Sequence, residues 1–286
     1  MQTALSTKLQ YMYLFINKIL KKIGFRISPI DSKPFDTVII SFPKSGRTWL
    51  RMIIGKVFAN YLGINKKLYP DAILNLPMFS ELSPLIPKVG YGHESSGTLK
   101  PSGVNKQKHY AKNLKIIFMV RDPRDVLVSQ YFSESKRTKN AYKQSISEFI
   151  YENKGSFDTI IEFYNSWADK KDYPKDFLLI KYEDLHTDTM KEIGKIIDFI
   201  GIQANEDILK DAVEFASFSN MRKIEAENPT KSITLKPTNI NDTETYKTRK
   251  GKIGDYKNHF TEKEINYLNK KMKENLSPFF GYNSNL

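Results

Sequence analysis

The sequence predicts an α/β domain with a central, mostly parallel sheet flanked by helices. Three short runs, at residues 37–40, 115–120 and 177–181, are apolar apart from one end residue each, and this is typical of strands buried on both faces. Segments of helical periodicity follow these runs, and this alternation favours parallel strands joined by helices. The 286 residues contain no linker-like or repetitive tract, so we expect one domain at residues 35–286, preceded by a basic amphipathic segment at residues 1–34.

The first strand leads into a tight turn, SFPKSGRTW at residues 41–49, and then into an amphipathic helix from Leu50. A strand–turn–helix of this kind points backbone N–H groups and the positive end of a helix dipole at one position. The turn adds a full positive charge, two hydroxyl groups and a glycine that permits close backbone approach, from Lys44, from Ser45 and Thr48, and from Gly46. These features together predict an anion-binding site.

This turn differs from the nucleoside-triphosphate loop Gly-x-x-x-x-Gly-Lys-Ser/Thr, because its lysine precedes the glycine and no upstream glycine is present. The shorter loop is suited to one phosphate-like group rather than a chain of them. Trp49 follows in the first helical turn, where a large ring gains little from packing, and its face is well placed to stack on a nucleobase. The alternative is an ordinary strand–turn–helix with a buried tryptophan.

A second strand–turn–helix begins at residues 115–120 and continues through RDPRD at residues 121–125. Asp122 is suited to cap the helix, and the proline that follows is suited to its first turn. Arg121 lies at the carboxyl end of the strand, the edge where open α/β sheets bind ligands, and Ser129 lies two turns along the helix. This pair predicts a second phosphate site. The alternative is that the two arginines of the turn only pair with its two aspartates.

Further helices are predicted downstream. Helical periodicity covers residues 189–200, with Gly201 as the stop, and residues 206–216, which we expect to close at residues 217–221. The polar stretch 228–248 lacks periodicity and is typical of a mobile loop.

The segment after this loop carries two adjacent cations. Arg249 and Lys250 precede Gly251 in RKGKIGDYKN, residues 249–258, and are typical of a clamp that closes over a bound anion. A final helix is predicted from the cap Thr261, which has a glutamate three residues later.

The composition argues against several classes of function. No cysteine is present and the four histidines lack the paired spacing of a metal site, so we expect neither thiol catalysis nor a metal centre. The formal charge of +13 favours anionic partners. No zinc-finger, aromatic RNA-binding or basic-zipper pattern accompanies this charge, so we expect no nucleic-acid partner. The lack of cysteine fits a reducing, cytoplasmic location.

The N-terminal segment has apolar residues at helical spacing over residues 5–23, with lysines largely elsewhere. Lys8 and Lys18 interrupt the apolar run, which is too short to span a membrane, and no small-residue cleavage site follows. We expect a helix that is frayed or packed on the domain. The alternative is a helix on an anionic membrane surface, which would make the protein membrane-peripheral.

With these segments assembled, the chain closely resembles the sulfotransferases that use 3′-phosphoadenylyl sulfate (PAPS), over about residues 36–280. Residues 42–49 resemble the family's 5′-phosphosulfate loop, residues 120–131 its 3′-phosphate motif and residues 249–258 its C-terminal clamp, with Tyr-Glu-Asp at 182–184 between them. The three motifs in this order are more specific than any one alone. The resemblance implies a P-loop-like fold, sulfuryl transfer from PAPS with adenosine 3′,5′-bisphosphate (PAP) as the product, and no metal.

The resemblance also implies roles for individual residues. The 5′ phosphosulfate would be held by the first turn, that is by Lys44, Ser45, Gly46, Arg47 and Thr48. The 3′-phosphate would be held by the second motif and the clamp, through Arg121, Ser129, Arg249, Lys250 and Gly251. The adenine would be surrounded by Trp49, Tyr182 and Phe218. His93, in VGYGHE, is the candidate for the catalytic base, ahead of His109, which precedes the strand that carries Arg121.

Two positions depart from the family pattern. Many members carry a lysine two residues before the catalytic histidine, where this chain has Tyr91, and this leaves Lys44 as the main cation expected on the bridging oxygen. A threonine often precedes the Ser-Phe adenine contact, where this chain has Ala216, and this removes one hydroxyl contact but leaves Phe218 to stack.

The expected reaction is in-line transfer to a hydroxyl, or secondarily to an amine, with Lys44 at the departing oxygen and His93 as the base. One alternative is a nucleotide-dependent kinase on a related fold, with Asp122 and Asp125 as candidate magnesium ligands. Another is a non-enzymatic basic protein that binds polyanions or membranes.

The acceptor is left open among phenols, lipid or sugar hydroxyls and peptide tyrosine, so a small-molecule, lipid or saccharide partner is expected. We expect it to contact residues 64–108, 142–157 and 228–248. These segments contain aromatic side chains that are suited to such contacts, namely Tyr69, Phe79, Tyr91 and Phe157.

Overall fold

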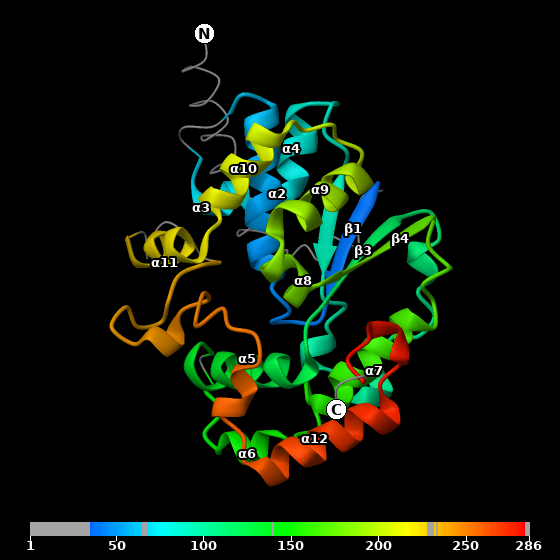
Figure 1. Cartoon of the computed structure of the whole chain (residues 1–286), viewed down its shortest axis with the longest axis vertical. Coiled ribbons are helices and arrows are strands. Elements are labelled where there is room, and N and C mark those ends of the chain that lie inside the picture. Colours follow the sequence, from blue (N-terminus) through cyan, green and yellow to red (C-terminus); the bar gives the residue numbers. More distant parts are fainter. Residues whose placement is uncertain (1–34, 65–67, 139, 228–231, 233, 284–286) are drawn as a thin grey trace.

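The sheet has four strands, all parallel, in the order β2-β1-β3-β4 (Figure 1). The computed structural model describes residues 35–64, 68–138, 140–227, 232 and 234–283, so the predicted amphipathic helix at residues 5–23 lies outside the described residues. The strands are β1 (Thr37–Ser41), β2 (Val89–Gly92), β3 (Lys115–Val120) and β4 (Asp176–Lys181).

Helices cover both faces of the sheet (Figure 1). One layer is formed by α2 (Arg47–Tyr61), α3 (Pro70–Ile73), α4 (Leu76–Leu82), α9 (Thr189–Ile200) and α10 (Glu206–Phe215). The opposite layer is formed by α5 (Pro123–Lys136), α6 (Ile146–Phe149), α7 (Phe157–Ala168) and α12 (Glu262–Asn275). The short α8 (Tyr182–Thr187) and α11 (Phe218–Glu227) lie near the carboxyl edge of the sheet.

The pleat of β1 sends alternate side chains into the two layers. Ile39 belongs to the core under α2 and α9, whereas Val38 and Ile40 belong to the core under α5 and α7. All three side chains are fully buried. This explains why the strand reads as a continuous apolar run rather than an alternating one.

The strand order reverses direction at β1. The chain passes from β1 to the edge strand β2 and then returns to β3 on the other side of β1. The carboxyl ends of β1 and β3 therefore flank a topological switch point, which is where open α/β sheets form their ligand crevices. The two motifs that follow these strands are brought together by this topology.

The structure confirms the fold class, the three predicted strands and the helix boundary at Gly201, which adopts φ 98°. One local prediction was wrong, because residues 218–227 form α11 and do not simply close the preceding helix. The Ser217 hydroxyl accepts a hydrogen bond from the Asn220 N–H at 3.4 Å and so starts this new helix. The described part of residues 228–248 is irregular, as expected, apart from a short 3-10 helix at Thr243–Thr245. Buried Leu235 and Tyr246 pack it against the rest of the domain.

The capping box at the start of α12 gives a direct test of local stability. Thr261→Ala removes the hydroxyl that accepts from the Glu264 N–H, so the free energy of unfolding should fall by about 1 kcal/mol in urea titrations. Thr261→Ser keeps the hydroxyl and should behave as wild type. Equal losses in both variants would contradict the capping role.

Candidate active site

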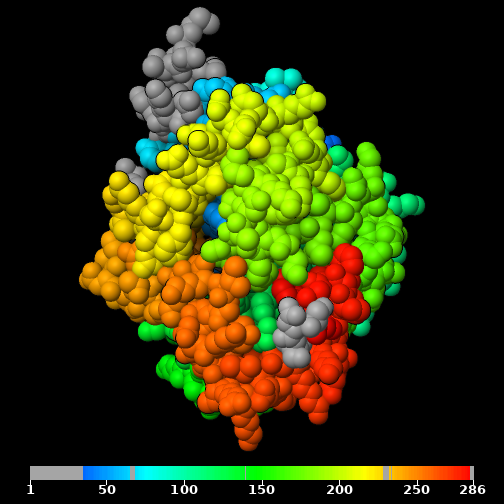
Figure 2. Space-filling view, in the orientation of Figure 1, coloured from blue at the N-terminus to red at the C-terminus, as the bar shows by residue number. Residues whose placement is uncertain are grey.

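A cavity of about 660 Å³ opens at the carboxyl ends of β1 and β3. Its walls come from segments far apart in the sequence, and Figure 2 shows the hollow between α11 and the α8–α9 region, with blue atoms of the β1–α2 region visible at its bottom. Most of the side chains predicted from the sequence line it, namely Lys44, Gly46, Arg47, Thr48, Trp49, His93, Arg121, Ser129, Tyr182, Phe218, Arg249, Lys250 and Gly251. The volume lies within the usual range for ligand sites, about 300–1,000 Å³.

The turn after β1 has the backbone of an anion cradle. Lys44 adopts φ 72° and Gly46 φ 99°, so two left-handed residues curl the chain toward the cavity. A Cβ atom at position 46 would lie 2.6 Å from the Tyr182 ring, so only glycine fits beneath that ring.

Ser45 is the one predicted site residue whose side chain is not brought to the cavity. It is fully buried, and its hydroxyl lies 3.5 Å from the Tyr164 hydroxyl. That tyrosine in turn accepts from the Arg121 N–H at 3.0 Å and donates to the Arg121 carbonyl at 2.9 Å. The expectation that the Ser45 hydroxyl faces the anion was therefore wrong. Through Tyr164, this hydroxyl instead links the turn after β1 to the turn after β3.

Aromatic side chains form one end of the cavity. Trp49 donates from Nε1 to the Ala216 carbonyl at 2.9 Å, and its ring meets Tyr182 edge-on at 5.8 Å. Phe218 is 48% exposed, and Gly251 packs so closely beside it that a Cβ there would lie 2.8 Å from the ring. These rings leave a slot suited to a flat heterocycle.

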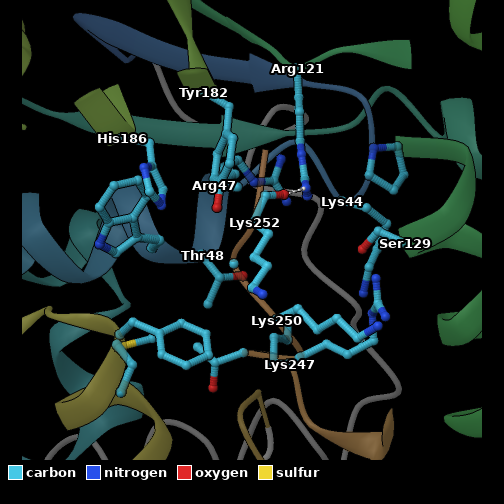
Figure 3. A pocket seen from close by; sticks show the side chains of 18 of the residues that line it. Lys44, Arg47, Thr48, Arg121, Ser129, Tyr182, His186, Lys247, Lys250 and Lys252 are labelled. Carbon is cyan, nitrogen blue, oxygen red and sulfur yellow. Dashed lines mark hydrogen bonds between the residues drawn. The ribbon is translucent and has the colours of Figure 1, made fainter. Parts of the chain in front are cut away.

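Arg121 and the C-terminal segment form the cationic wall next to this slot. The Arg121 guanidinium lies 4.4 Å from the Tyr182 ring centroid and donates to the Lys252 carbonyl at 2.9 Å. Its Nε is buried with no hydrogen-bond partner among the described residues. Figure 3 shows Tyr182 and Arg121 on one side of the cavity and Lys247 and Lys250 on the other.

Arg249 reaches the cavity but is already paired. Its two terminal nitrogens lie 3.1 Å from Glu244 and 2.8 Å from Asp255, and Lys250 lies 3.6 Å from Asp255. An anion in the cavity must therefore share these cations with fixed carboxylates.

The aspartates of the second motif are both engaged in structure. Asp122 caps α5 and pairs with Arg124 at 2.6 Å. Asp125 accepts from the backbone N–H groups of Gly254 at 2.8 Å and Tyr256 at 3.0 Å, which docks the clamp on α5. Neither aspartate is among the described residues that line the cavity. The two candidate magnesium ligands of the kinase alternative therefore do not face the site.

Crowding of cations shifts their pKa values. Desolvation, together with Lys247 and Arg137, lowers the pKa of Lys44 well below its usual value. Desolvation and Arg51 lower the pKa of Arg47 to about 9. Lys247 keeps exposed surface toward the cavity, yet desolvation and neighbouring Arg137 lower its pKa to about 8. A bound anion would reverse each of these shifts.

His93 follows β2 and is held in one tautomer. Its Nδ1 lies 2.7 Å from the Ser41 carbonyl, which can only accept, so Nδ1 carries the proton and Nε2 has a free lone pair. Desolvation and the charge of Arg47 lower the His93 pKa well below its usual value, so the ring is neutral at pH 7. A neutral imidazole with a free Nε2 can accept a proton from a ligand.

The loop after His93 is anchored by a buried ion pair. Glu94 and Ser95 adopt φ 47° and 57°, which is strained for residues with side chains. The Glu94 carboxylate accepts from Lys108 at 2.6 Å, from Trp167 at 3.0 Å and from the Tyr110 hydroxyl. The Lys108 side chain is completely buried.

Some cavity residues were missed by the sequence reasoning, notably Lys247, Lys252, Gln130, Ser133 and Glu134. Ser133 follows Ser129 by one helical turn, and Glu134 follows Gln130 in the same way, so the periodicity of α5 held a usable signal. Lys247 lies in the aperiodic stretch 228–248, and Lys252 lies within the predicted clamp at residues 249–258 but was not among the residues named there.

The described residues contain no group of three or more His, Cys, Asp or Glu side chains that could hold a metal ion. No helix in the described part of the chain is both long and apolar enough to cross a membrane.

The parallel sheet and the cavity at its carboxyl edge define an α/β protein with a cation-lined cavity. A model of the sulfotransferase domain matches residues 34–280, and the chain therefore belongs to the sulfotransferase family. It is an enzyme of the sulfotransferase class, and neither the kinase nor the non-enzymatic alternative gains support from its relatives.

Two relatives illustrate the similarity. Sulfotransferase 1E1 of Bos taurus is 29% identical over 248 residues, which cover 82% of this chain and 81% of the relative. Sulfotransferase 2A2 of Rattus norvegicus is 28% identical over 259 residues, which cover 86% of each chain.

Solved structures show the same fold. Mouse sulfotransferase SULT7A1 complexed with PAP has a TM-score of 0.58 and 25% identity, and covers 87% of this chain and 86% of its own. Retinol dehydratase in complex with androsterone and inactive cofactor PAP has a TM-score of 0.59 and 20% identity, and the match covers 90% of this chain and 84% of its own. At this identity the match shows a shared fold only.

The Glu94–Lys108 pair gives a stability prediction. Lys108→Met leaves a buried carboxylate without its cation, so the free energy of unfolding in urea should fall by about 3–5 kcal/mol. The double variant Glu94→Gln, Lys108→Met should recover much of this loss.

Lys106→Met is the matched control. Lys106 pairs with Glu162 on the surface, where ion pairs contribute little, so stability should barely change. A Lys108→Met variant as stable as this control would contradict the buried-pair assignment.

Proposed function

We propose that the protein transfers the sulfuryl group of PAPS to a hydroxyl group, or secondarily to an amine, of a small-molecule acceptor. One observation carries this proposal: a single cavity combines a cationic turn, an aromatic slot, a second cationic wall and a histidine with a free Nε2. The PAP-bound mouse relative supports PAPS as the donor.

The donor fits the cavity by its chemistry. The turn with Lys44, Gly46, Arg47 and Thr48 would hold the 5′ phosphosulfate, with Ser45 acting through the backbone. Arg121, Ser129, Arg249, Lys250 and Gly251 would hold the 3′-phosphate, and Trp49, Tyr182 and Phe218 would enclose the adenine. Arg121 and Ser129 both line the cavity, which supports their part in this assignment.

In the proposed reaction the acceptor oxygen forms a bond to sulfur while the bond from sulfur to the 5′-phosphate oxygen breaks. The acceptor proton passes to Nε2 of His93, and the negative charge that gathers on the departing phosphate is stabilised by Lys44 and the backbone of the turn. Position 91, where many family members have a lysine, supplies no cation because Tyr91 is uncharged. Its ring centroid lies 3.4 Å from the Arg51 guanidinium.

We further propose a cytoplasmic location, which the absence of cysteine supports. The basic, amphipathic pattern of residues 5–23 supports peripheral contact with an anionic membrane as a second possibility.

Substitution of His93 tests the base. His93→Ala should lower kcat by about 10²–10⁴ and leave the PAP dissociation constant from calorimetry unchanged. His109→Ala is the control, because His109 is exposed and bonded to Gln107 outside the cavity, so both quantities should stay at wild-type values. Full activity in His93→Ala would show that His93 is not the group that accepts the proton.

The affinity for PAP should fall as the pH rises from 7 to 9. Protonated Lys247 favours the anion, and its pKa of about 8 means that this charge is present below pH 8 and lost above it. One pH unit above that value, the loss of one required charge weakens binding about tenfold, as calorimetry at pH 7, 8 and 9 would measure.

Two variants separate the contribution of Lys247. Lys247→Met should bind PAP more weakly at pH 7 and show a flatter pH dependence. Lys210→Met removes an exposed lysine of α10 and should keep the wild-type slope. An affinity that does not depend on pH in the wild-type protein would rule out this role for Lys247.

A further inference from the structure

His186 lines the cavity at its aromatic end. The described lining residues with rings are Trp49, Tyr182 and Phe218, together with the imidazoles of His93 and His186. The His186 ring centroid lies 6.2 Å from that of Trp49 and 5.9 Å from that of Tyr182. The Trp49 and Tyr182 centroids are themselves 5.8 Å apart, so the three rings form one contiguous group. These contacts place His186 at the aromatic slot.

The aromatic side chains that we expected to meet the acceptor lie outside this lining. Phe79 and Phe157 are buried in the two cores, and the Tyr91 ring centroid lies 3.4 Å from the Arg51 guanidinium. None of these three rings, nor Tyr69, is among the described residues that line the cavity. The expectation that they meet the acceptor was therefore wrong, and the aromatic rings that do reach the cavity are those of the slot.

Helix α8 brings His186 to this place. Tyr182 and His186 are four residues apart on this helix and so lie on the same face. In Figure 3 Tyr182 lies between His186 and Arg121, and its ring contacts both, at 5.9 Å from the His186 ring and 4.4 Å from the Arg121 guanidinium. His186 therefore lies on the side of the slot away from the arginine assigned to the 3′-phosphate.

The ring nitrogens of His186 are available to a ligand. The side chain is exposed, and no hydrogen bond or ion pair joins it to another described residue. Neighbouring polar groups are engaged within the protein, because Trp49 Nε1 donates to the Ala216 carbonyl at 2.9 Å and the Thr189 hydroxyl donates to the Leu185 carbonyl at 2.8 Å. An imidazole can form hydrogen bonds through both of its nitrogens.

We propose that His186 determines the specificity of the enzyme for the base of its donor. This inference rests on the proposed use of PAPS. Both phosphates of PAP are joined to adenine through the ribose, so the edge of the six-membered ring is the part of the base furthest from them. That edge presents N1 as an acceptor and the N6 amine as a donor. With the 3′-phosphate at Arg121 and the base in the slot, it meets His186, and one imidazole nitrogen forms a hydrogen bond with N1 or with the N6 amine.

The stacking rings alone would select poorly among bases. Every base has a flat face, so stacking on Trp49 and Phe218 tolerates any of them. A hydrogen bond to the base edge distinguishes bases by the donors and acceptors that they carry there. His186 supplies this distinction in the slot.

The test measures nucleotide affinity by calorimetry on the full chain. Three ligands are compared: PAP, the 3′,5′-bisphosphate of 1-deazaadenosine, which lacks N1, and that of purine riboside, which lacks the N6 amine. His186→Phe keeps a ring beside Trp49 and Tyr182 but removes both nitrogens. The PAP dissociation constant should rise about threefold to tenfold in this variant. The wild-type protein should bind the analogue that lacks the bonded atom more weakly by the same factor, and for that analogue His186→Phe should cause no further loss.

His109→Phe is the matched control. His109 is also an exposed histidine with its ring beside a tyrosine, Tyr173 at 6.3 Å, but it is not among the described residues that line the cavity. This variant should bind all three nucleotides as the wild-type protein does.

The outcomes separate this inference from the proposed function. If the wild-type protein does not bind PAP, the proposed use of PAPS fails, and the role of His186 fails with it. If PAP binds equally well to the wild-type protein and to His186→Phe, the assignment of His186 alone is overturned. An equal loss for all three nucleotides would also overturn it, because such a loss reflects the shape of the slot and no bond to the base edge.

Discussion

The crowding of cations at one edge of the sheet is the constraint on which the site depends. The topology brings the ends of β1 and β3 together, so Lys44 and Arg47 share a cavity with Lys247 and Arg249. Their mutual repulsion and their desolvation are unfavourable in the absence of an anion, as the lowered pKa values of Lys44 and Lys247 show. The fold must hold these groups in place by other means.

Fixed polar contacts supply that restraint. Glu244 and Asp255 hold Arg249, and Asp125 fixes the backbone of the clamp through Gly254 and Tyr256. The Tyr164 hydroxyl joins the two motif turns through the backbone of Arg121. The cations are thus placed before the ligand arrives, which lowers the reorganisation needed on binding.

Much of this architecture was predictable because it depends on local sequence. The apolar runs of β1 and β3 and the stop at Gly201 follow from periodicity and backbone preference. The lining of the cavity by Lys44 and Arg121 follows because each residue lies in the turn after a parallel strand, and the carboxyl ends of such strands share an edge.

The remaining features of the fold and site depend on tertiary contacts, which cannot be predicted from local sequence patterns. β2 has only four residues, two of them glycine, and its pairing with β1 decides that it is a strand. Ser45 has the residue type of an anion ligand, but Tyr164 from α7 takes its hydroxyl. Lys247 comes from a stretch without periodicity, so only its packing places it at the cavity.

Helix α5 contributes four residues to the lining of the cavity from one rigid element, namely Ser129, Gln130, Ser133 and Glu134. Each residue of an α-helix turns the chain by about 100°, so an insertion or deletion here would rotate the downstream contacts away from the cavity. The spacing of the polar groups on this wall is therefore fixed by helix geometry. The chemistry of the wall can change by exchange of side chains, whereas changes in chain length are tolerated mainly in the loops.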